Sequence, residues 1–342
     1  MQLLCTAIPA LENMAKEEDG RKKIAQITRY VTVGLALITA YGYYAYLKNM
    51  GVLTNTGVFA AIVMIACYTA GSCLILWLGE KINENGIGNG ISIILFTNIV
   101  SSGPTIIQSL IAYFTSKSVG YIIAAVLMII IFLAMVIFII FMDNSERRLP
   151  VQYAKRVVGR KMYGGQSSTL PMKLNMAGVM PIIFANSILA LPSTIAMLFP
   201  TPEKGTFWYG FQQLFSYTSW LYVVLFLVLI VFFSYFYIGI SFNPIEVANN
   251  LKKNGGFIPG IRPGKPTCDY ITKVLNKITL MGATFLGIIA VLPLVVNIIS
   301  GNRMSGIAFA GTSIIIVVGV AIETAREVEA QMTMRHYKGF LE

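Results

Sequence analysis

Eight long apolar runs constrain the fold of this chain more than any other feature. Each has about 20 residues or more, which is the length that an α-helix needs to cross a bilayer. The sequence therefore predicts an all-α integral membrane protein with eight transmembrane helices. The runs are residues 27–47, 57–79, 91–112, 119–142, 176–199, 216–240, 277–299 and 306–325.

Basic residues are concentrated in alternate gaps between these runs. Of the 26 Lys and Arg residues, 22 lie in one set of gaps. The other set holds only Lys48, Lys117, Lys204 and Arg303. The positive-inside rule assigns the richer gaps to the cytoplasm. We therefore expect the first gap, the two long basic loops (143–175 and 241–277) and the tail after residue 325 to be cytoplasmic.

The composition agrees with a membrane protein. The chain is 56% hydrophobic with a mean hydropathy of +0.71, whereas a soluble domain is about 45–50% apolar. The net charge of +11 is then a surplus on one side of a membrane rather than a nucleic-acid footprint spread over a fold. A single loop arginine can simply set topology and contact anionic membrane lipids. Evidence for partner binding therefore comes from each of the two long loops as a whole and not from one arginine.

The membrane runs lack the residues that intramembrane chemistry requires. Glu80 and Glu323 are the acidic residues nearest the membrane, and no Lys, Arg or Asp lies in mid-span. Ionisable groups inside a bilayer usually mark ion pathways and proton relays. Their absence disfavours a proton-coupled carrier, an intramembrane protease and a metal enzyme. We predict no enzyme, no metal and no cofactor; a secondary transporter or a lipid flippase remains the alternative.

The cysteines and the first residues are less informative. Cys5 and Cys268 are isolated, and Cys67 and Cys73 are six residues apart within one run, so no C-x-x-C motif indicates zinc or redox chemistry. Residues 1–9 resemble the last turns of an apolar helix and lack the features of a signal peptide. We expect that the chain is a fragment or that an internal methionine was taken as its start.

Two runs contain helix-breaking residues. Run 91–112 has Ser101-Ser102-Gly103-Pro104 near its middle, and run 176–199 contains Gly178, Pro181 and Pro192. Proline removes a backbone donor and kinks a helix, which is tolerated beside protein or a water-filled cavity. These helices either face an interior path or carry ordinary kinks.

The two basic loops contain ordered structure. In 241–277, Asn243 as cap, Pro244 and Glu246 predict a helix that continues through Lys252 and stops near Gly255-Gly256. The proline-rich segment that follows is suited to holding Arg262 away from the membrane. Loop 143–175 has a strand-like stretch from Leu149 to Val158. Both loops could dock an acidic partner, either RNA or a protein. Residues 86–90 are best explained as a tight turn between membrane helices.

Several motifs together resemble the SecY family, which is the central subunit of the bacterial protein-conducting channel. The resemblance covers essentially the whole chain, with all eight runs in the family's order. The motifs are Gly20–Tyr30, Trp77–Glu80, Gly86–Ser92, Glu146–Arg156, Tyr163–Ser168, Leu170-Pro171, Asn175–Pro181, Gly255–Pro266 and Phe309–Ser313.

The resemblance implies a ten-helix fold whose two inverted halves surround an hourglass pore. The eight runs would be helices three to ten, and the first helix, the plug and most of the second helix would be missing. Residues 1–112 would be the remainder of the N-terminal half, and 113–342 the connection and the C-terminal half. Unfolded polypeptides would cross through the middle. Signal peptides would leave sideways, past runs 27–47, 176–199 and 216–240.

The resemblance also implies specific sites and partners. The aliphatic pore ring would include Leu95, Ile99, Ile183 and Ile316. An apolar constriction gates ions by dewetting and offers a passing peptide no binding site. Docking of the motor ATPase SecA or of the ribosome would involve Arg148, Arg160 and Arg262. The small subunits SecE and SecG, signal peptides and unfolded preproteins would be further partners.

Overall fold

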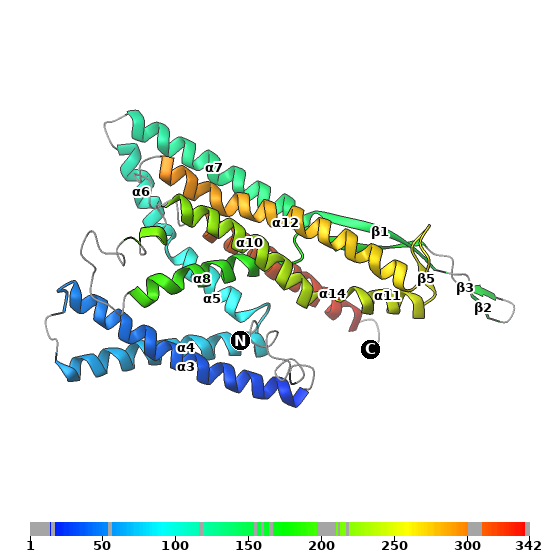
Figure 1. Ribbon diagram of the computed structural model, residues 1–342, viewed down its shortest axis with the longest axis horizontal. Helices are drawn as coiled ribbons and strands as arrows, with labels where there is room; N and C mark the ends of the chain where they lie inside the picture. Colours follow the sequence, from blue (N-terminus) through cyan, green and yellow to red (C-terminus); the bar gives the residue numbers. More distant parts are fainter. Residues whose placement is uncertain are drawn as a thin grey trace. The chain divides into compact units, whose positions relative to one another are not determined.

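Each of the eight apolar runs contains helix in this computed structural model (Figure 1). The structure describes residues 14, 18–53, 57–115, 119–153, 156–158, 161–163, 167–196, 210, 213–216, 219–299 and 310–338. Within those residues, six helical segments are long and apolar enough to cross a membrane. The prediction of a helical, multi-pass membrane protein is therefore confirmed.

The membrane-length segments and the remaining helices follow the order of the runs. The helices that form the long segments are α3 (Glu18–Asn49), α4 (Val58–Asn85), α5 (Gly90–Ser101) with α6 (Gly103–Thr115), α7 (Val119–Asn144), α10 (Trp220–Ser241) and α12 (Lys265–Ile299). The other two runs contain α8 (Met180–Ala196) and α14 (Ala310–Lys338). With 17 residues, α8 is short for a complete crossing.

The break in run 91–112 lies where its sequence predicts. α5 ends at Ser101 and α6 begins at Gly103, so only Ser102 separates the two helices. Pro104 lies in the first turn of α6, where the missing N–H of proline leaves no intrahelical hydrogen bond unmade. The proline therefore starts a second helix instead of kinking one continuous helix.

Two predicted boundaries are wrong. Run 176–199 predicts a membrane helix interrupted at Gly178, Pro181 and Pro192, but α8 begins only at Met180, after a series of turns in which Gly178 has φ of 60°. That left-handed backbone, which glycine adopts readily, is incompatible with an α-helix. Loop 241–277 is also shorter than predicted, because α12 already begins at Lys265 and is helical through the last residues assigned to the loop.

α3 and α4 form an antiparallel hairpin that is held together at two levels. Near one end, Arg29 Nε donates to Glu80 Oε1 at 2.7 Å. Further along, Tyr43 and Tyr68 meet edge to face, with ring centroids 5.2 Å apart. Ala36 and Ala40 lie between these levels on α3 and are buried. Small side chains such as these permit the close helix approach that is common in membranes.

The connection from α4 to α5 is the expected tight turn. Asn83 Oδ1 accepts a hydrogen bond from the Gly90 N–H at 2.7 Å, and Gly88 has φ of 79°. A Cβ on Gly90 would collide with the carbonyl oxygen of Gly79 in α4. The glycines thus permit a turn that is too tight for larger residues.

The chain divides into two compact units. The first contains residues 1–101, 187–219 and 320–342, and the second contains residues 102–186 and 220–319. The core of the second unit lies between α10 and α12, where Phe226 and Ile230 of α10 and Leu286 and Ala290 of α12 are at most 3% exposed. The predicted division into halves 1–112 and 113–342 stays a prediction.

Candidate functional sites: a basic loop platform and aliphatic constriction residues

The two basic loops are joined into one folded structure. β1 (Glu146–Tyr153) pairs with β4 (Ser167–Lys173) of its own loop and with β5 (Gly256–Phe257) of the other loop. The pairing Gln152↔Phe257 connects two segments that are about a hundred residues apart in the chain. Together with α11 (Pro244–Lys253) and residues 258–277, which include the first part of α12, these strands make up what we call the loop platform.

A shorter ribbon extends the first of these loops beyond the sheet. β2 (Arg156–Val158) pairs with β3 (Lys161–Tyr163), and Figure 1 shows this ribbon beyond the end of β1. The predicted strand-like stretch from Leu149 to Val158 is thus two strands, with β1 beginning earlier, at Glu146. Arg160, one of the three predicted docking arginines, lies outside the described residues.

The start of α11 is built as its sequence predicts. The Asn243 side-chain oxygen accepts from the backbone N–H groups of Ile245 and Glu246, at 3.2 and 3.4 Å. Pro244 occupies the first turn, where a backbone donor is not needed. The helix ends at Lys253, and Gly255 follows with φ of 70°. The cap at Asn243 and the glycine after the helix are therefore enough to set both ends of α11.

The loop platform has its own apolar core. Leu149 and Val151 of β1 are buried, whereas Arg148, Pro150 and Gln152 between and beside them are exposed. This is the alternation expected of a half-buried strand. The buried side chains pack in two clusters: Leu149, Met172, Ala177, Ile238, Leu275 and Ile278 in one, and Val151, Leu251, Ile258 and Ile271 in the other. The platform is therefore anchored to the end of α10 and the beginning of α12.

Exposed basic side chains outnumber the exposed acidic ones on the loop platform, which are Glu146, Glu246 and Asp269. The exposed basic side chains are Arg147, Arg148, Lys173, Lys252, Lys253, Arg262, Lys265, Lys273 and Lys277. The Arg148 side chain is 72% exposed, and its Nε lies 3.8 Å from Glu146 Oε2, which is too long for a strong ion pair. Arg148 can therefore turn toward another anion without losing a good internal contact.

Arg262 lies in the segment between β5 and α12. Its side chain is exposed, and its backbone carbonyl accepts from Thr267 Oγ1 at 2.9 Å. Thr267 itself is only 2% exposed. The backbone at Arg262 is thus fixed by a buried hydroxyl and by the flanking Pro263, while the guanidinium group points into solvent.

The four predicted ring residues occupy three helices and are all half-buried. Leu95 and Ile99 lie one turn apart on the same face of α5, in the first unit. Ile183 lies in the first turn of α8, and Ile316 lies in α14; both belong to the second unit. Half-burial of an aliphatic side chain on a membrane helix suits either a pore wall or a lipid contact.

The residue just before α8 approaches α14 closely within the second unit. A Cβ added to Gly319 of α14 would lie 2.9 Å from a side-chain methyl of Val179. Val179 precedes Ile183 by one helical turn, and Gly319 follows Ile316 by about one turn. The structure therefore brings the neighbourhoods of these two ring candidates together.

Two features of the structure were not predicted from the sequence. The β1–β5 pairing has no local signal, because β5 is only two residues long. The Arg29–Glu80 ion pair joins residues 51 positions apart, and nothing in either helix alone indicates it. Among the described residues, no group of three His, Cys, Asp or Glu is arranged to hold a metal ion.

Comparison with known proteins gives a consistent result. The family model for SecY matches residues 1–325. The protein translocase subunit SecY of Streptomyces galbus is 42% identical over 352 residues, covering all of this chain and 80% of the relative. The corresponding subunit of Mycobacterium bovis is 40% identical over 356 residues, covering all of this chain and 79% of the relative.

Solved structures with a similar fold are protein-conducting channels. A structure reported with the finding that the SecY plug domain stabilises the closed state of the channel has a TM-score of 0.63 and 16% identity, and the match covers 92% of this chain and 75% of that one. A structure described as that of a protein conducting channel has a TM-score of 0.59 and 16% identity. That match covers 90% of this chain and 74% of the other chain. A yeast Ssh1 complex bound to the 80S ribosome has a TM-score of 0.59 and 15% identity. That match covers 90% of this chain and 73% of the other chain.

Proposed function

The chain belongs to the SecY family, and we propose that it forms the polypeptide-conducting pore through an aliphatic constriction that includes Leu95, Ile99, Ile183 and Ile316. As a member of that family it is the pore-forming subunit of a protein translocation channel, a multi-pass membrane protein that passes unfolded polypeptides. This membership decides against the secondary transporter or lipid flippase that the helix count alone would permit. We propose no catalytic step for the chain itself.

The single observation that carries this proposal is the identity of about two residues in five with translocase subunits along the whole chain. The close approach of Val179 and Gly319 supports the ring assignment, because it brings the first turn of α8 near the Ile316 region of α14. Leu95 and Ile99 would complete the ring from α5.

An aliphatic ring suits a pore that must pass many different sequences. Water is unfavourable in a narrow apolar neck, so the closed neck excludes ions without needing a charged gate. The same side chains offer no hydrogen-bond partner at which a moving polypeptide could be retained. Signal peptides would leave the pore sideways, between α3 on one side and α8 with α10 on the other.

The ring assignment is tested by making the neck polar. In the complete native protein with its membrane partners, Ile316→Asn should raise the single-channel conductance in a planar bilayer, because an amide gives water hydrogen-bond partners. It should also permit export of a reporter with a defective signal sequence. Ile130→Asn is the matched control, since Ile130 lies on α7 and is 61% exposed. Equal conductance of the two variants would contradict the ring assignment.

We propose further that the loop platform docks the partner that drives or feeds translocation, either SecA or the ribosome. Its exposed guanidinium groups at Arg148 and Arg262 can bond carboxylates or phosphates with two parallel hydrogen bonds. Arg160 would belong to the same surface. The ribosome-bound yeast neighbour supports a ribosomal partner, whereas SecA, SecE and SecG are carried over from the family.

The same proposal gives an orientation. The loop platform and the tail after residue 325 would face the cytoplasm of a cell whose plasma membrane holds the channel, since 22 of the 26 basic residues lie on that side. Signal peptides and unfolded preproteins would then enter from the cytoplasmic face.

A further inference from the structure

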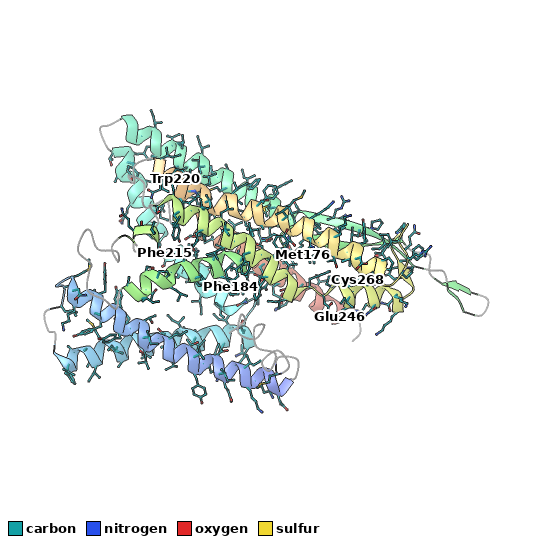
Figure 2. All side chains as sticks on the ribbon, in the orientation of Figure 1. Met176, Phe184, Phe215, Trp220, Glu246 and Cys268 are labelled. Carbon is teal, nitrogen blue, oxygen red and sulfur yellow. The ribbon has the colours of Figure 1, made fainter. Side chains whose placement is uncertain are left out.

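The residue that follows Ile183 is aromatic and contacts α10. Phe184 packs its ring against Phe233 of α10, with centroids 5.7 Å apart and an interplanar angle of 50°. Figure 2 labels Phe184 on α8, and both rings belong to the second compact unit. Tilted and edge-on arrangements at this spacing are favourable aromatic contacts.

Phe233 is itself held firmly in place. It is 3% exposed, and it lies on the buried face of α10 together with Phe226 and Ile230. Its ring also meets the ring of Phe236 edge to face, with centroids 6.4 Å apart. A side chain enclosed in this way has a fixed position, so it can serve as a reference point for α8.

The start of α8 is held by its packed side chains: Pro181 is fully buried, and Ile182 and Ala185 are 0% exposed. The helix follows a series of turns in which Gly178 has φ of 60°, and no atom would lie within 4 Å of a Cβ at that glycine. A glycine in this left-handed conformation redirects the backbone but has no side chain that could orient the helix after it. The side chains of the first turn must therefore set the rotation of α8.

Two of those side chains flank Ile183. Successive residues of a helix point about 100° apart around its axis, so Ile182 and Phe184 lie on either side of Ile183. Ile182 is 0% exposed and Phe184 contacts Phe233, while Ile183 between them is half-buried. Fixing both neighbours fixes the direction of Ile183.

We propose that Phe233 is a positioning residue for the constriction. Through its contact with Phe184 it sets the rotation of α8, and thereby keeps the Ile183 side chain in the neck of the closed pore. The inference rests on the proposed function, because it assumes that Ile183 is part of the ring. Phe233 itself touches neither the neck nor the polypeptide in this account; it acts only through α8.

The test compares two adjacent phenylalanines of α10. In the complete native channel, Phe233→Leu should raise the resting single-channel conductance roughly three- to tenfold, which is the population shift expected from losing one aromatic pair. Phe232→Leu is the control: Phe232 is 58% exposed, and its ring contacts Phe233, at 5.3 Å between centroids, and Phe236 on its own helix. It therefore removes an aromatic contact of Phe233 within α10 but leaves the Phe184–Phe233 contact in place. That control should keep the resting conductance of the unchanged protein.

A second pair of variants separates positioning from a general loss of packing. Phe184→Leu, which removes the other ring of the contact, should raise the conductance as Phe233→Leu does. The double variant Phe184→Leu with Phe233→Leu should conduct no more than the stronger single variant, because both changes remove the same contact. A leak caused by looser packing elsewhere would instead add up in the double variant.

Each outcome bears on a different claim. Ile183→Asn serves as the positive control. If Ile183→Asn does not raise the resting conductance, both the assignment of Ile183 to the ring and this inference are wrong. If Ile183→Asn leaks but Phe233→Leu and Phe184→Leu behave like Phe232→Leu, the ring stands and the positioning role of Phe233 is wrong. If Phe233→Leu does not fold, Phe184→Leu decides the question alone: an unchanged conductance would refute the proposal.

Discussion

At the scale of single residues, a glycine allows a helix to pack directly against the backbone of another segment. Gly282 of α12 packs directly against the turn before α8: a Cβ there would lie 2.5 Å from the carbonyl oxygen of Leu174. Real Cβ atoms do not approach a backbone oxygen so closely, and the neighbouring atom cannot rotate away as a side chain would. This contact joins α12 to the segment that precedes the proposed constriction helix.

Gly282→Ala should therefore destabilise the protein. Forcing an extra methyl group into a packed contact costs about 1–3 kcal/mol, and the expected readout is a lower thermal unfolding midpoint in detergent. Gly239→Ala on α10 is the control, since no atom lies within 4 Å of the Cβ that it adds. An unfolding midpoint equal to that of the control would show that the α12–Leu174 contact is looser than the structure indicates.

Residues differ in how far the sequence reveals their role. The Asn243 cap is predictable, because the side chain bonds backbone groups two and three residues away. Ile183 and Ile316 are chemically indistinguishable from the many lipid-facing isoleucines, so only family resemblance selects them. Phe233 carries no sequence signal at all, because its importance depends on a ring of another helix.

At the scale of elements, apolar length predicts membrane helices well and connections poorly. The break between α5 and α6 follows from Gly103 and Pro104, and α11 follows from its cap and its terminal glycines. The late start of α8 depends on the left-handed turn at Gly178 and on the packing of Leu174 against Gly282 of α12, which an apolar run does not reveal. The sheet that joins the two basic loops is equally non-local, since β1 recruits a partner strand from beyond α8 and α10.

The loop platform makes a testable prediction about Arg262. Arg262→Glu in the complete chain should leave membrane insertion intact, because the side chain is exposed and its guanidinium group is not packed in the platform core. It should weaken partner-driven transport, since a carboxylate repels the anion that a guanidinium group would bind. Lys48→Glu is the control for the change of charge alone, because Lys48 lies in the last turn of α3 and not in the loop platform. Transport by Arg262→Glu at the rate of that control would count against the docking role.

At the scale of the whole molecule, the charge asymmetry predicts the topology. Reporters fused within 143–175 or within 241–277 should be cytoplasmic, and a reporter fused near Lys204 should be outside, because 22 of 26 basic residues lie on one side. Enzymatic reporters that are active in only one compartment measure this directly. A reversed pattern at both basic loops would defeat the orientation and, with it, the proposed entry face for preproteins.

The central claim is that a polypeptide passes between Ile183 and Ile316, and site-specific crosslinking tests it most directly. In a background whose four native cysteines are replaced by serine, a translocating chain with one cysteine is arrested in the channel and oxidised. Ile183→Cys and Ile316→Cys should each form a disulfide adduct with that chain, whereas Ile130→Cys on α7 should form none. Adducts of equal yield at all three positions, or at Ile130→Cys alone, would contradict the claim that these residues line the path.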